Sequence, residues 1–96
     1  MKPIALFTLP NCKWCQEAIS YLKSRKLKFN QIDLTKNKKA LYDCQKRCKG
    51  APVFLVGDVW ICGFDKGKLN KELGIRNPSN QKFLNELSWV MLELKL

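Results

Sequence analysis

Residues 7–16, FTLPNCKWCQ, place two cysteines two residues apart, directly after a short apolar run and a proline. The run at residues 4–8 has the composition of a short β-strand. From the second cysteine onwards, apolar side chains recur at the spacing of one helix face, at Cys15, Ala18, Ile19 and Leu22. Cys12 and Cys15 are therefore predicted to lie at the junction between a strand and the helix that follows it.

This junction gives the two cysteines different chemistry. Cys12 falls at or just before the first helical turn, where unpaired N–H groups, the helix dipole and the neighbouring Lys13 stabilise a thiolate. Cys15 follows one turn later, within bonding reach of the first sulfur, and can attack a mixed disulfide formed there. Zinc sites use the same spacing, but a C-x-x-C pair at a strand-to-helix junction favours redox chemistry. We therefore expect Cys12 to be the nucleophile and Cys15 the resolving thiol.

The next part of the chain repeats the alternation of strand and helix. Residues 29–33 alternate apolar and polar side chains, as a half-buried strand does. A helical stripe follows at Ala40, Leu41, Cys44 and Cys48. Because a strand, a helix and a second strand form a right-handed crossover, the first two strands are expected to be parallel.

Two β-rich runs at residues 53–56 and 59–62 are separated by Gly57-Asp58, which suits a tight antiparallel hairpin. Residues 66–73 follow as a short helix that Gly74 can end. The sequence therefore predicts an α/β fold in which helices flank a mixed, four-stranded sheet.

The chain after residue 76 is predicted to add one more helix. Asn77, Pro78 and Ser79 interrupt the pattern, and a helical stripe follows at Phe83, Leu87, Val90, Met91 and Leu94. We expect residues 1–76 to form the main domain and residues 77–96 a helical extension packed on it.

Composition narrows the setting and the partners. The 96 residues suit one domain, and five cysteines are too few for a secreted disulfide scaffold, which favours a reducing, cytoplasmic compartment. We expect neither a signal peptide nor a membrane span. Eighteen Lys and Arg against eight Asp and Glu give a net charge of +10, which attracts anionic substrates or acidic proteins. We see no basic helix interleaved with exposed aromatic residues, and therefore do not expect binding to nucleic acid. We expect a monomer or weak dimer.

Three segments carry a resemblance to a known family: LPNCKWC at 9–15, GAPVFLVGD at 50–58 and WICGFD at 60–65. Over about residues 4–74 the sequence resembles the glutaredoxin branch of the thioredoxin superfamily. The resemblance implies a thioredoxin-like fold and a dithiol–disulfide oxidoreductase that needs no metal or organic cofactor and reduces protein or small disulfides. It also implies a cis peptide bond before Pro52, facing the two cysteines. The residues expected to contact the substrate are Lys13, Trp14, Ala51, Pro52, Gly63, Phe64 and Asp65.

The electron donor stays open between glutathione and thioredoxin reductase. Leu9 stands where glutathione-using members of the family carry a lysine, and only Gly63 and Asp65 remain of a Gly-Gly pair with acidic residues. These departures resemble the NrdH-type redoxins, which thioredoxin reductase reduces and which serve ribonucleotide reductase. Trp14, in contrast, is closer to the aromatic residue between the cysteines of a glutaredoxin.

The remaining cysteines allow more than one interpretation. Cys44 and Cys48 share a helical stripe and are expected to be buried and inert. The alternative is that they join Cys12 and Cys15 in a zinc or iron–sulfur site, as in a metal-binding module. Cys62 replaces a glycine of the family pattern and is expected to be a core residue at a strand end. The alternatives are that it forms an alternative disulfide or reacts with oxidants.

Overall fold

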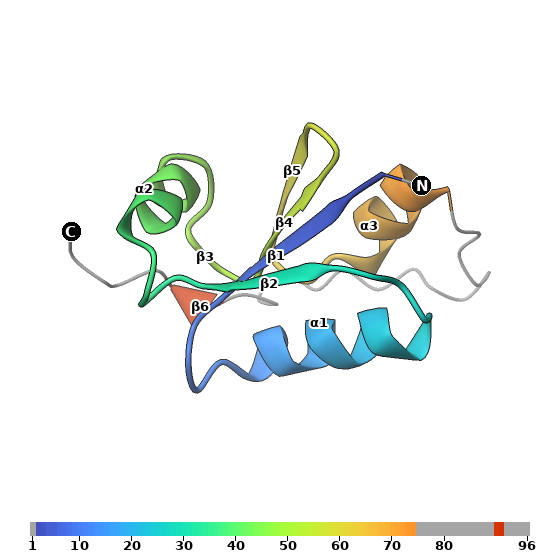
Figure 1. Ribbon diagram of the computed structural model, residues 1–96, viewed down its shortest axis with the longest axis horizontal. Coiled ribbons are helices and arrows are strands. Elements are labelled where there is room, and N and C mark those ends of the chain that lie inside the picture. The colour runs from blue at the N-terminus through green and yellow to red at the C-terminus, as the bar shows by residue number, and fades with distance from the viewer. Residues whose placement is uncertain (1, 75–89, 92–96) are drawn as a thin grey trace.

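The computed structural model describes residues 2–74 and 90–91, and its main sheet has four strands in the order β2-β1-β4-β5 (Figure 1). Strand β1 (Ile4–Thr8) runs parallel to β2 (Asn30–Asp33) and antiparallel to β4 (Val53–Val56). Strands β4 and β5 (Val59–Cys62) form a hairpin whose turn residue Gly57 has a φ of 61°. The predicted mixed, four-stranded sheet is confirmed.

Helices cover both faces of this sheet, because successive residues of its strands place apolar side chains on opposite faces. Helix α1 (Lys13–Ser24) and helix α3 (Lys66–Leu73) pack on the face that carries Leu6 and Phe54. Helix α2 (Lys38–Arg47) packs on the opposite face, against Phe7 and Val53. Figure 1 shows α1 and α2 on opposite sides of the strands. The core is therefore divided into two layers by the sheet.

The helices begin at side chains that accept hydrogen bonds from their first turns. Asn37 accepts from the Ala40 N–H at 3.0 Å at the start of α2, and Asp65 accepts from the Lys68 N–H at 3.1 Å at the start of α3. Helix α3 ends at Gly74, which takes a left-handed conformation with a φ of 74°. Of these three residues, Gly74 is the one that the sequence predicts as a helix end. Among the described residues, no helix is long and apolar enough to cross a membrane.

A second, two-stranded sheet joins the middle of the chain to its C-terminal part. Strand β3 (Gly50–Ala51) pairs antiparallel with β6 (Val90–Met91), with Ala51 opposite Val90. The predicted C-terminal helix otherwise falls on residues 77–89 and 92–96, which lie outside the described part of the chain. At Val90 and Met91 that prediction is wrong, because their backbone pairs with β3 in a strand.

Candidate active site

Cys12 is itself the N-cap residue of α1. Its backbone is extended, and its sulfur accepts a hydrogen bond from the Cys15 N–H at 3.1 Å. Asn11 precedes it with a φ of 56°, a left-handed conformation that asparagine tolerates and that turns the chain from β1 into α1. The first turn of α1 carries no acidic residue, so no like charge opposes a thiolate at this position. The predicted strand-to-helix junction is confirmed.

Cys12 and Cys15 are joined by a disulfide, with their Cα atoms 5.2 Å apart. Both are almost fully buried, in a small cluster with Ala51 against which Leu9 and Trp14 pack. The Cys12 sulfur lies 3.8 Å from the carbonyl oxygen of Ala51. The structure therefore describes the pair in its oxidised state, in contact with the residue just before Pro52.

The Ala51-Pro52 peptide bond is cis, as the family resemblance implies. Gly63 reaches the same place from the end of β5, where its N–H donates to the Pro52 carbonyl oxygen at 2.8 Å. Gly63 has a φ of 77°, a left-handed conformation that would be strained for a residue with a side chain. Ala51, Pro52 and Gly63 are therefore neighbours, although ten residues lie between Pro52 and Gly63 in the chain.

Phe64 and Asp65 have structural contacts of their own. Phe64 is buried in the core, with its ring centroid 5.7 Å from that of Tyr21. Asp65 caps α3 through the Lys68 N–H. Their predicted roles in substrate binding stay predictions, and these contacts explain their presence without a substrate.

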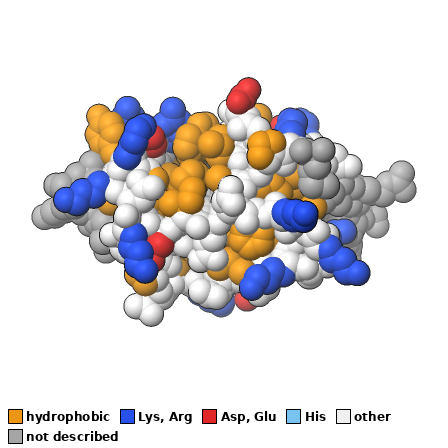
Figure 2. Space-filling view, in the orientation of Figure 1, with side chains coloured by type: hydrophobic (Ala, Val, Ile, Leu, Met, Phe, Trp, Pro, Cys, Tyr) orange, Lys and Arg blue, Asp and Glu red, His pale blue; other side chains and the backbone are white. Residues whose placement is uncertain are grey.

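Lys13 and Trp14 lie on the first turn of α1, beside the disulfide. Lys13 is exposed, and its ammonium nitrogen is 5.5 Å from the centre of the Trp14 ring. Trp14 is partly buried against the cysteine cluster and also against the core below α1. On the face drawn in Figure 2, lysine and arginine side chains are spread around the margin rather than gathered in one patch. On this face, positive charge therefore attracts anions generally rather than marking one site.

The remaining cysteines are not brought to the Cys12–Cys15 pair. Cys48 is buried as expected, but it is not an unpaired thiol, because it forms a disulfide with Cys62. The expectation that Cys62 is a core residue is wrong, because Cys62 is exposed, and the alternative disulfide at Cys62 is found. Cys44 is buried and unpaired, and burial followed by the charge of Asp43 raises its pKa to about 12. Residues 2–74 and 90–91 hold no group of three or more His, Cys, Asp or Glu that could bind a metal. The alternative four-cysteine metal site is therefore not assembled.

Sequence reasoning missed two features near the site. The pairing of Cys48 with Cys62 brings together the end of α2 and the end of β5, and no spacing rule predicts it. The only signal was the cysteine at position 62 where the family pattern has glycine. The pairing of β6 with β3 was also missed, because the apolar residues around Val90 read as a helix stripe.

Comparisons with known proteins agree on the fold and the family. A family model described as Glutaredoxin matches residues 4–61. A curated relative from Clostridium pasteurianum, an uncharacterized glutaredoxin-like 8.6 kDa protein in a rubredoxin operon, is 29% identical over 70 residues, which are 71% of this chain and 93% of the relative.

Two solved structures are similar in fold. A mutant of the thioredoxin-like protein BC3987 superposes with a TM-score of 0.71 at 23% identity, covering 79% of this chain and all of that one. The glutaredoxin-like protein NrdH-redoxin from Escherichia coli gives a TM-score of 0.68 at 21% identity, covering 72% of this chain and 92% of that one. The thioredoxin-like fold predicted from the sequence is confirmed.

Proposed function

Because this chain belongs to the glutaredoxin family, we propose that it is a dithiol–disulfide oxidoreductase whose Cys12 and Cys15 reduce protein or small-molecule disulfides. One observation carries the proposal: Cys12 caps α1 and is bonded to Cys15. A disulfide at this place is the product expected after the pair has given up two electrons.

The reaction proceeds by two thiol–disulfide exchanges. The Cys12 thiolate attacks one sulfur of the substrate disulfide, forming a mixed disulfide and releasing the other sulfur as a thiolate, which takes a proton. Cys15 then loses its proton and attacks the Cys12 sulfur, so the second substrate sulfur leaves as a thiolate and is protonated. Two electrons and two protons pass to the substrate, and the Cys12–Cys15 disulfide remains.

The local electrostatics support this division of roles. The α1 N-terminus and Lys13 stabilise negative charge at Cys12, and the Cys15 N–H already points at the Cys12 sulfur. Cys12 and Cys15 are both almost fully buried, so the assignment of Cys12 as the attacking thiol rests on its place at the start of α1. Cys12 is therefore the attacking thiol and Cys15 the resolving one.

The edge beside Pro52 supports binding of an extended substrate segment. Strand β3 offers backbone groups of Gly50 and Ala51 for strand addition by a substrate that displaces β6, which pairs with them in this structure. Pro52 ends that pairing because it has no N–H. In this proposal Ala51 and Gly63 bind the substrate backbone through main-chain groups. Lys13 and Trp14 form the rim that its side chains meet.

Leu9 favours a second candidate function, that of an NrdH-type electron carrier that thioredoxin reductase reduces. Leu9 packs against Cys12 and Cys15 as an apolar side chain, at the position where a lysine would bind a glutathione carboxylate. In this second proposal thioredoxin reductase with NADPH reduces the protein at least as well as glutathione does. A side-by-side assay of both donors with one small disulfide substrate separates the two.

Two single substitutions test the central proposal. Cys12→Ser removes the nucleophile and should abolish disulfide reduction, whereas Cys15→Ser should accumulate a mixed disulfide between Cys12 and the substrate, detected by mass spectrometry of the intact protein. Cys44→Ala is the matched control, and should turn over like the wild type because Cys44 lies outside the site. Full activity in Cys12→Ser would refute the assignment. Metal content and thiol titration after anaerobic purification test the competing metal-binding class.

A further inference from the structure

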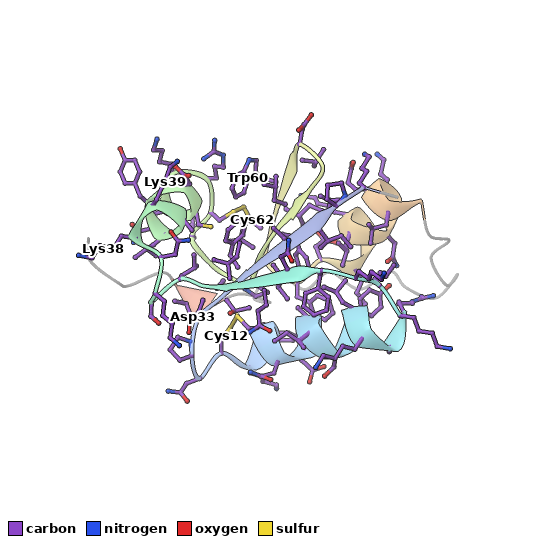
Figure 3. All side chains as sticks on the ribbon, in the orientation of Figure 1. Cys12, Asp33, Lys38, Lys39, Trp60 and Cys62 are labelled. Carbon is purple, nitrogen blue, oxygen red and sulfur yellow. A yellow bond between two sulfur atoms is a disulfide. The ribbon has the colours of Figure 1, made fainter. Side chains whose placement is uncertain are left out.

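The second disulfide lies on the α2 side of the sheet, away from the proposed catalytic pair. Cys48 directly follows α2 and Cys62 is the last residue of β5, and their Cα atoms are 5.4 Å apart. Cys48 belongs to the core layer under α2, whereas Cys12 and Cys15 pack with Ala51. Figure 3 labels Cys12 at the start of α1 and Cys62 on the other side of the strands. The chain therefore contains two separate sulfur pairs.

The two residues of this second pair differ in exposure. Cys62 is exposed, whereas Cys48 is only 7% exposed. A thiolate in solution can therefore approach the Cys62 sulfur, with Cys48 as the leaving group. Arg47, the residue before Cys48, places its guanidinium over the ring of Trp60 at 4.5 Å, on the strand that ends at Cys62. This positive charge favours an incoming thiolate and stabilises the one that leaves.

No third thiol in the described residues competes for this bond. Cys44 is one helical turn before Cys48, but it is buried, and burial raises its pKa to about 12. It therefore stays protonated at neutral pH and is a poor nucleophile. Exchange of the Cys48–Cys62 disulfide with the Cys44 thiol is therefore disfavoured.

We propose that Cys48 and Cys62 form a second reversible thiol–disulfide site, which a small dithiol reduces by attack on the exposed Cys62 sulfur. The dithiol's first thiolate bonds to the Cys62 sulfur, the Cys48–Cys62 bond breaks, and Cys48 leaves as a thiolate and takes a proton. The dithiol's second thiolate then closes its own disulfide and releases Cys62, which is protonated. The dithiol loses two electrons and two protons, and the two cysteines gain them.

The position of the bond gives this site a link to the substrate edge. Cys48 is two residues before Gly50, where β3 begins, and Cys62 is directly followed by Gly63, whose N–H is bonded to the Pro52 carbonyl. The disulfide therefore joins the two segments that approach Pro52 from either side. Reduction of the second pair removes the covalent link between these two segments.

The test uses the full chain with Cys12→Ser and Cys15→Ser, so its outcome is independent of the proposed function. The protein is equilibrated in graded mixtures of reduced and oxidised dithiothreitol, quenched with an alkylating agent and weighed by mass spectrometry, with peptide mapping. We expect one transition, in which the protein gains two alkyl groups, on Cys48 and Cys62. Reoxidation should reverse this transition, and the circular dichroism spectrum should stay unchanged throughout. Adding Cys48→Ser is the matched control and should remove the transition.

Three results would overturn the proposal. Labelling of Cys48 and Cys62 in every mixture would show that the bond does not form. Reduction that occurs only together with loss of the circular dichroism signal would make the bond a structural cross-link. Labelling that protects Cys44 in place of Cys48 or Cys62 would show a different pairing.

Discussion

Leu9 shows how one side chain bears on the choice of electron donor. It is partly buried against the Cys12–Cys15 pair, and an apolar side chain there offers nothing to a carboxylate. A charge-assisted hydrogen bond contributes on the order of 1.5–3 kcal/mol, which corresponds to roughly ten- to a hundredfold in affinity.

We therefore expect Leu9→Lys to raise the glutathione-dependent rate, up to roughly the tenfold range, because it supplies such a bond to a glutathione carboxylate. The measurement is the steady-state rate with glutathione against that with thioredoxin reductase. Leu9→Met is the control, because it keeps the apolar packing without a charge. An equal rate for the lysine and methionine variants would contradict this role of position 9.

Cys44 makes stability depend on pH. Its pKa is raised from 9.0 to about 12, first by burial and then by Asp43. Between these values the unfolded chain has lost the Cys44 proton while the folded chain keeps it, so the unfolded state binds fewer protons and stability falls as pH rises. Below the lower value both states are protonated, and this residue adds no pH dependence.

Urea unfolding at a series of pH values, with both disulfides intact, checks this prediction. The free energy of unfolding should decline above about pH 9 in the wild type and decline less in Cys44→Ala, which has no thiol to ionise. Parallel pH profiles for the two proteins would show that Cys44 is not the titrating group.

Among the elements, α2 depends on the residue that caps its start, Asn37. The Asn37 side chain accepts from the Ala40 N–H, satisfying one of the donors that a helix start leaves open. Asn37→Ala should lower the free energy of unfolding by about 1 kcal/mol, measured by denaturant titration. Asn37→Ser keeps an acceptor and should lose much less. Equal losses in both variants would assign the effect to something other than capping.

In the proposed function, strand β6 is the element that competes most directly with a substrate. It pairs with β3, the edge that the proposed function gives to the substrate. We expect Val90→Pro to raise kcat/KM for a protein disulfide substrate, because proline lacks the N–H and weakens strand pairing. Val90→Ala keeps the backbone donor and serves as the control. No difference between these variants would show that β6 does not compete for the edge.

The elements that the sequence predicted are those with local causes. Apolar spacing marks α1 and α2, the Gly57-Asp58 turn marks the β4–β5 hairpin, and Gly74 ends α3. The Cys12 cap could be placed because it follows from the same local pattern. The β3–β6 pairing and the Cys48–Cys62 bond depend on which distant segments meet, and that is decided by tertiary packing. The cis bond before Pro52 was reached only through the family resemblance.

For the whole molecule, the net charge of +10 affects association with charged substrates. Opposite charges are attracted at long range, and salt screens that attraction over about 10 Å at 0.1 M ionic strength. The rate with oxidised glutathione, an anion, should therefore fall as salt is raised. A neutral small disulfide is the control and should show little change; equal salt dependence for both would exclude steering by net charge.

The pairing of β6 with β3 also makes the chain carry its own peptide ligand. A segment of the same chain competes for its binding site at an effective concentration that does not depend on the concentration of the protein. Dilution therefore does not release it, and in the proposed function it excludes protein substrates that bind the edge weakly. In the proposed function, a protein substrate that adds to β3 must therefore bind Gly50 and Ala51 better than Val90 and Met91 do.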